Sequence, residues 1–128
     1  MTIASAVCSS FKTEVLRAIH NFTQGGNEFK LALYVSSANL GATTTAYATN
    51  PGGGGNTEVA NGNGYTTKGA ALTNVTPALD GTTACCDFAD ISFTSASFTA
   101  NGCLIYNETA NGDPAVCTIA FGGDKTVS

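Results

Sequence analysis

The chain offers few side chains suited to acid–base chemistry. His20 is its only histidine, which rules out a metal site built from several histidines. Carboxylates come closest to clustering at Asp80, Asp87 and Asp90, but Asp87 and Asp90, three apart on a strand, would point to opposite faces of a sheet. A general acid–base pair needs both groups in one cleft. We therefore expect no catalytic residue and interpret His20 as a surface or half-buried helix residue.

The cysteines allow two interpretations. The five are Cys8, Cys85, Cys86, Cys103 and Cys117. An odd number leaves at least one unpaired within the chain. They either act as small buried apolar residues or include one disulfide among the last four. Zinc is disfavoured because Cys-x-x-Cys is absent, and the adjacent Cys85 and Cys86 on a strand would point to opposite faces. No Asp-x-Asp-x-Asp calcium loop is present either, so we expect no metal.

Motifs for phosphate binding are incomplete. Gly62-x-Gly64 lacks the third glycine and following helix of a dinucleotide loop, and Lys68 precedes Gly69 without a phosphate-cradling loop before it. The net charge is −4 and the five Lys and Arg residues are scattered, whereas nucleic-acid binding needs clustered positive charge. We expect neither a cofactor nor a nucleic-acid partner.

Aromatic residues raise one binding hypothesis. The four tyrosines are Tyr34, Tyr47, Tyr65 and Tyr106, and tryptophan is absent. Such rings could form a sugar-stacking platform, although core and interface roles are commoner for tyrosine. An exposed Tyr47 or Tyr65 would favour a carbohydrate-binding adhesion module.

The elements that must position these residues fit one domain over residues 1–128. After an N-terminal arm (1–9), the apolar residues Phe11, Val15, Ala18, Ile19 and Phe22 recur with the period of a helix, which predicts an amphipathic helix over 10–22. The period then changes to two over 28–35, which predicts a half-buried strand that gives the helix a sheet to lie on.

Residues 36–64 predict a long loop, with a short strand near 43–48. The segment is rich in Thr, Ala, Asn and Gly and contains the run Gly52, Gly53, Gly54 and Gly55, which is costly to order and buries little. Long loops in small domains are often functional or disordered. We therefore predict a flexible contact arm here, together with the N-terminal segment. The predicted partner contacts are Thr2, Ile3, Tyr47, Gly52, Gly53, Gly54, Gly55 and Tyr65.

Residues 65–123 predict a β-rich body of short strands. The expected strands are 70–75, 83–88, 91–93, 98–99, 103–107 and 115–121, with turns at Asp80-Gly81, Asn101-Gly102 and Asn111-Gly112-Asp113-Pro114. The last two strands predict a terminal hairpin. We predict a mainly β, α+β fold: one N-terminal helix packed on an antiparallel β-sandwich or open barrel, with a long Gly/Thr-rich loop.

The composition favours a protein that lies against a partner or outside a cell. Charged residues make up 11% of the chain, against about 25% in an average soluble domain. No apolar run is long enough to span a membrane. The N-terminus lacks the positive and apolar regions of a signal peptide, so export by the secretory route is not expected.

Motif order along the chain gives a family resemblance. Ser10-Phe11-Lys12-x-x-Val15-x-x-x-Ile19-His20-x-Phe22 leads to Phe29-Lys30-Leu31-Ala32-Leu33-Tyr34, Gly62-x-Gly64-Tyr65-Thr66, Asp87-Phe88-Ala89-Asp90, Leu104-Ile105-Tyr106-Asn107 and Phe121-Gly122. This order resembles a family of small structural proteins of tailed bacteriophages, over roughly residues 10–123. The resemblance implies a virion component without enzymatic activity or cofactor. Members of that family continue into another strand after the position of Lys125, so here either the sheet has one strand fewer, with an open edge, or the sequence is incomplete.

Three functions follow as hypotheses. The first is a capsid decoration, or cement, protein that binds the assembled lattice of the major capsid protein, forms homo-oligomers on the particle and is assembled in the host cytoplasm. The second is a tail, neck or fibre-associated structural protein. The third is the carbohydrate-binding adhesion module.

Overall fold

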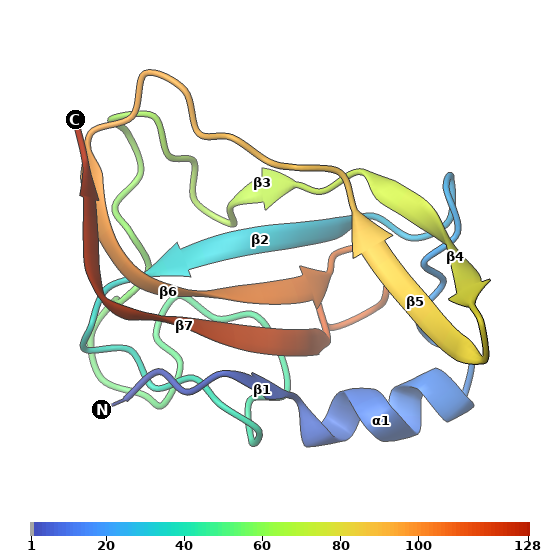
Figure 1. The fold of residues 1–128 in the computed structure, drawn as a ribbon. Helices are drawn as coiled ribbons and strands as arrows, with labels where there is room; N and C mark the ends of the chain where they lie inside the picture. Colours follow the sequence, from blue (N-terminus) through green and yellow to red (C-terminus); the bar gives the residue numbers. More distant parts are fainter. Residues whose placement is uncertain (1) are drawn as a thin grey trace.

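The computed structural model describes residues 2–128 and is mainly β, with one short helix. Its five-stranded sheet is antiparallel and has the order β1-β7-β6-β2-β3, while β4 and β5 form a separate hairpin (Figure 1). Neither sheet is closed. The elements are β1 (Ala6–Val7), α1 (Ser9–Leu16), β2 (Phe29–Tyr34), β3 (Ala70–Ala71), β4 (Asn74–Asp80), β5 (Thr83–Phe88), β6 (Phe98–Asn107) and β7 (Ala115–Val127).

Helix α1 ends six residues before the position that the apolar period predicts. Ala18 adopts φ 60°, its amide donates to the Val15 carbonyl, and the Ile19 amide donates to the Glu14 carbonyl. This pair of bonds is the Schellman motif that closes a helix through a left-handed residue. The apolar residues of 11–22, which were expected on one helix, are therefore divided between α1 and the segment after it. The helix itself lies beside β1 and the edge of the sheet, not across its face (Figure 1).

Strand β2 is buried on both faces. Its predicted alternation is confirmed: Leu33 belongs to one apolar cluster, while Ala32 and Tyr34 belong to another on the opposite face. The expectation of a half-buried strand was wrong, because the long loop covers the face that carries Ala32 and Tyr34. Ala38 and Leu40 from this loop pack on Tyr34.

The loop of 36–64 has no named strand, as predicted, but it is not a free arm. The Val35 amide donates to Thr57, and the Val59 amide donates to Leu33, at 2.9 Å each, so residues 57–59 run along the end of β2. The short strand expected near 43–48 reduces to one bridge between Ala46 and Pro114. The loop therefore forms a layer over one face of the sheet.

The N-terminal segment is also attached to the body. Ala6 and Val7 pair with β7, and the Leu40 amide donates to the Thr2 carbonyl at 3.0 Å. Ile3 is buried. The prediction of a free arm over residues 1–9 was therefore wrong within the part of this segment that the structure describes.

The β-rich body differs from its prediction at three places. The expected strand 70–75 is β3 followed by the start of β4, and 91–93 is not a strand. The turn at Asn101-Gly102 is absent because β6 runs through it. Gly102 is required there by packing: a Cβ would lie 2.6 Å from the Ile119 carbonyl oxygen and from Ile3 Cγ2. The strand 83–88, its turn at Asp80-Gly81 and the terminal hairpin of β6 and β7 are confirmed.

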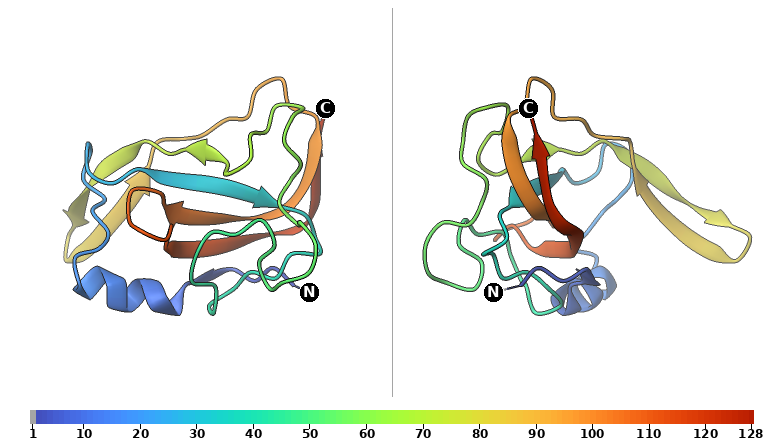
Figure 2. Two further views of the ribbon diagram at one scale, coloured as in Figure 1. Left: turned by 180° about the vertical axis from the view of Figure 1, so that it is seen from behind. Right: turned by 60° about the vertical axis from the view of Figure 1, so that its left-hand side comes forward.

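The hairpin β4–β5 stands away from the sheet. In Figure 2 it projects from the body as an arm, on the side of the sheet opposite the long loop. Along β4 only Asn74 is buried, and along β5 only Phe88 is less than exposed. The first face of the sheet is thus covered by residues 36–64, and the second face is only partly covered.

Candidate interaction surface

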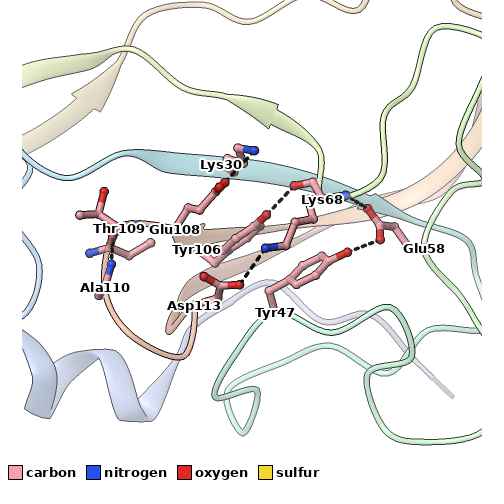
Figure 3. Close-up of polar contacts among 10 residues, drawn as sticks. Lys30, Tyr47, Glu58, Lys68, Tyr106, Glu108, Thr109, Ala110 and Asp113 are labelled. Carbon is pink, nitrogen blue, oxygen red and sulfur yellow. Dashed lines mark hydrogen bonds and ion pairs between the residues drawn. The ribbon is translucent and has the colours of Figure 1, made fainter.

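A buried carboxylate, Glu58, ties the long loop to the sheet (Figure 3). It is 5% exposed. Its two oxygens accept the phenols of Tyr47 and Tyr65 at 2.5 Å each, and the Lys68 amide donates to it at 2.8 Å. Three donors from separate segments therefore satisfy one buried charge, which is the condition for keeping it in the interior.

The tyrosines around Glu58 are core residues. Tyr65 is 2% exposed, and its hydroxyl also accepts the Leu33 amide at 3.0 Å. The Tyr47 ring stacks on Tyr106 at 4.8 Å, and Lys68 Nζ lies 5.7 Å from its centre. Burial, and after it the hydrogen bond to Glu58, raise the pKa of Tyr65 far above its usual range, and Tyr47 shifts the same way for the same causes.

Two predicted partner contacts are not exposed in a single copy of the chain. Tyr65 is buried, and Tyr47 is half-buried with its ring and hydroxyl engaged. An exposed Tyr47 or Tyr65 would have favoured the carbohydrate hypothesis, and that support is lacking. The network is a structural tie between loop and sheet.

His20 lies in the turn after α1, not on the helix, and its side chain is fully buried. Asn107 Nδ2 donates to its Nδ1 at 3.1 Å, and its Nε2 lies 3.0 Å from Glu14 Oε1. Its ring packs on Phe11 at 4.8 Å. Since Nδ1 is the acceptor, the proton of the neutral ring lies on Nε2 and faces Glu14. The prediction of a helix residue was wrong, because α1 ends before His20; the residue as a whole is half-buried, as one of the predicted alternatives had it, while its side chain is fully covered.

The five cysteines are all free, and they divide by environment. Cys8 and Cys103 are buried, Cys117 is intermediate, and Cys85 and Cys86 are exposed on the hairpin. Burial, with a smaller contribution from Cys117, raises the pKa of Cys8 to about 11 and that of Cys103 to about 12. A thiol with such a pKa is a poor nucleophile at neutral pH. Cys86 and Cys117 both line a groove between the sheet and the base of the hairpin.

The three candidate carboxylates are divided between two places. Asp80 lies at the tip of the hairpin, whereas Asp87 and Asp90 lie near its base. The expectation that Asp87 and Asp90 share a strand was wrong, because β5 ends at Phe88, and both residues line one groove. Over residues 2–128 no group of three or more His, Cys, Asp or Glu side chains could hold a metal ion. In the same part of the chain no helix is long and apolar enough to cross a membrane.

The remaining predicted contacts lie on one side of the molecule. Thr2 is exposed and hydrogen-bonded beside Leu40, and Gly52 lies against the adjacent Asn39. Gly53, Gly54 and Gly55 form an exposed turn with open space around them. Ile3 is buried, so of the N-terminal pair only Thr2 presents a surface.

One uncovered apolar surface is a groove on the face of the sheet that carries Leu31 and Ile105, which we call the apolar groove. Two hollows of about 600 and 320 Å³ share Leu31 and Ile91 and so form one groove. Its floor includes Leu31, Ile105 and Cys117, and its wall includes Phe88 and Ile91 from the hairpin base and the segment after it. The groove has an acidic end, with Asp87 and Asp90, and a basic end, with Lys125.

The hairpin adds a second uncovered apolar surface. Leu79 near its tip is 72% exposed and Val75 is 44% exposed. Its only charges are Asp80 and Asp87. Large apolar side chains left exposed beside a groove of the same character suggest an interaction site. Sequence reasoning missed both surfaces, although the charge-poor segment 70–79 was a signal for the arm.

Comparison with protein families, with curated proteins and with solved structures finds no match to this chain. The candidate site therefore has to be interpreted from its own geometry.

Proposed function

We propose that this chain is a structural protein of a tailed-phage particle: a capsid decoration protein that binds the assembled lattice of the major capsid protein. One observation carries the proposal. A single copy leaves the apolar groove and the hairpin uncovered while only 11% of its residues are charged. Such a surface suits a protein that works in an assembly, since charge is what keeps separate domains apart in solution. The family resemblance of its motif order adds the phage setting.

In this role the exposed side formed by Thr2 and the turn Gly52–Gly55 contacts the lattice. Glu58 and its three donors hold the preceding loop on the sheet, so the turn is presented from a fixed base. Preorganisation of this kind reduces the entropy lost on binding. The groove faces away from the long loop, so neighbouring molecules can cover it and supply the second layer of a sandwich over the sheet.

Binding only to the assembled lattice would stabilise the shell by mass action. Contacts among neighbouring copies would add avidity to weak single contacts. No catalytic residue, cofactor, nucleic acid or membrane enters this function, and the protein acts in the virion after assembly in the host cytoplasm.

The test uses particles of the encoding phage from which this gene has been deleted. Purified chain should bind their heads saturably in a sedimentation assay and raise the temperature at which they release DNA. Deletion of Gly52–Gly55 should abolish both effects, whereas Leu16→Ser, at an exposed helix position, should not. Binding to isolated tails only would favour a tail, neck or fibre protein, and binding to neither would contradict the proposal.

A further inference from the structure

We propose that the apolar groove is the docking site for the β4–β5 hairpin of a second copy of this chain. The inference goes beyond the proposed function because it concerns self-association of the chain itself. It starts from two apolar surfaces that a single molecule does not cover. One is the concave apolar groove, and the other is the hairpin with its exposed Val75 and Leu79. The hairpin projects from the body (Figure 2).

The shapes suit each other. The hairpin arm has seven residues in β4 and six in β5, so it reaches about 20 Å from its base. It is only two strands wide, and Leu79 near its tip is almost fully exposed. A two-stranded arm alone is marginally stable in water and gains stability when an apolar surface covers it. The groove supplies such a surface along the sheet.

The charges of the hairpin and of the groove favour the hairpin as the occupant and set the direction in which it lies. The hairpin carries two negative charges and no positive one, with Asp80 at the tip. The groove is acidic at the end beside its own hairpin and basic at the other end, where Lys125 lies. In the described part of the chain neither Asp80 nor Lys125 forms an ion pair. An arm that enters with its tip toward Lys125 pairs these two charges and keeps Asp80 away from Asp87 and Asp90.

A contact of this kind joins two different surfaces, so it is heterologous unless two copies exchange arms reciprocally. Exchange closes a dimer, and head-to-tail docking builds a ring or a network. Both place the same hairpin in the same groove, so the pairing of Asp80 with Lys125 is common to them.

The experiment exchanges the two charges. Native mass spectrometry and sedimentation velocity on the purified full chain should show concentration-dependent oligomers. Asp80→Lys alone and Lys125→Asp alone should each weaken self-association by about tenfold or more, since attraction becomes repulsion. A mixture of the two variants should restore it, as oligomers that contain both proteins, because each hairpin then meets a groove of opposite charge. Lys12→Asp, an exposed helix position, is the control and should associate like the wild type.

A wild-type chain that stays monomeric at millimolar concentration would overturn the inference. So would single reversals that associate like the wild type, or a mixture that remains monomeric. Self-association is measured on purified protein without particles. A failure to self-associate is therefore distinguishable from a failure of the chain to bind phage heads.

Discussion

The phenol of Tyr65 donates to the carboxylate of Glu58 at 2.5 Å, and both residues are buried. The hydroxyl of Tyr65 also accepts the Leu33 amide. This one hydroxyl therefore connects β2 to the carboxylate of Glu58. Two further donors reach the same carboxylate, from Tyr47 and the backbone of Lys68.

Tyr65→Phe should therefore destabilise the fold by about 2 kcal/mol, the range for a hydrogen bond to a charged group. The change leaves the Leu33 amide without its acceptor and Glu58 with one donor fewer. Urea unfolding measures it. Tyr47→Phe is the matched control, because it removes a bond to the same carboxylate from a half-buried ring, and its effect should be smaller. Equal stability of Tyr65→Phe and wild type would refute the role given to the network.

Ala18→Gly should stabilise the protein by about 0.5–1 kcal/mol. Ala18 occupies the left-handed position of the Schellman motif at φ 60°, a conformation that glycine adopts without the steric strain of a Cβ. Thermal unfolding of the two proteins measures the change. Ala42→Gly, at an exposed loop position without positive φ, should not stabilise. A lower melting temperature for Ala18→Gly would show that the helix does not end in this motif.

The imidazole of His20 should carry a proton on Nε2 and none on Nδ1. Asn107 donates to Nδ1, and the orientation of Asn107 is fixed because its Oδ1 accepts the amides of Thr109 and Ala110 at 3.1 Å each. Nitrogen-15 NMR of the imidazole distinguishes the tautomers. Asn107→Asp should disturb this preference, whereas a Nδ1-protonated ring in the wild type would contradict the assigned bonds.

Stability should fall as the pH rises above 9. The thiols of Cys8 and Cys103 have an ordinary pKa of 9.0, which burial raises to about 11 and about 12 in the folded protein. Between these values the unfolded state loses protons that the folded state keeps, so the free energy of unfolding decreases with pH. Below pH 9 this contribution is fully present.

Urea unfolding across pH 8–11 tests this dependence. The variant with Cys8→Ala and Cys103→Ala should show a shallower decline over the same window, although its stability at neutral pH is lower. Cys85→Ala, at an exposed position, should decline like the wild type. Identical slopes for the buried-cysteine variant and the wild type would refute the assignment.

Part of the fold follows from the sequence and part does not. The period of two in 28–35 predicts β2, and the turn Asp80-Gly81 and the strand 83–88 are predicted as well, because they are set by local patterns. The first strand of the hairpin, β4, was expected too early, at 70–75. The end of α1 is not predictable in this way: Ala18 is a good helix former, and the contacts of His20 with Asn107 and Phe29 of the sheet are long-range. Gly102 similarly imitates a turn signal, although close packing against Ile3 and Ile119 requires it.

The candidate site was harder to predict than the fold. Alternation identifies the apolar faces of a strand but not the segments that cover them. Residues 36–64 cover one face of β2 and leave the other partly uncovered. Which face the loop covers depends on long-range hydrogen bonds such as those of Glu58. For the same reason Tyr65 looked exposed in a loop while it is in fact buried. The exposed turn Gly52–Gly55, in contrast, could be placed from composition alone.

The most direct test of the proposed role is the copy number of this chain in purified phage particles, measured by quantitative mass spectrometry against the major capsid protein. A decoration protein should be present at a copy number comparable with that of the capsid protein. A few copies per particle would place the chain in the tail or neck, and its absence from the particles would contradict the virion role.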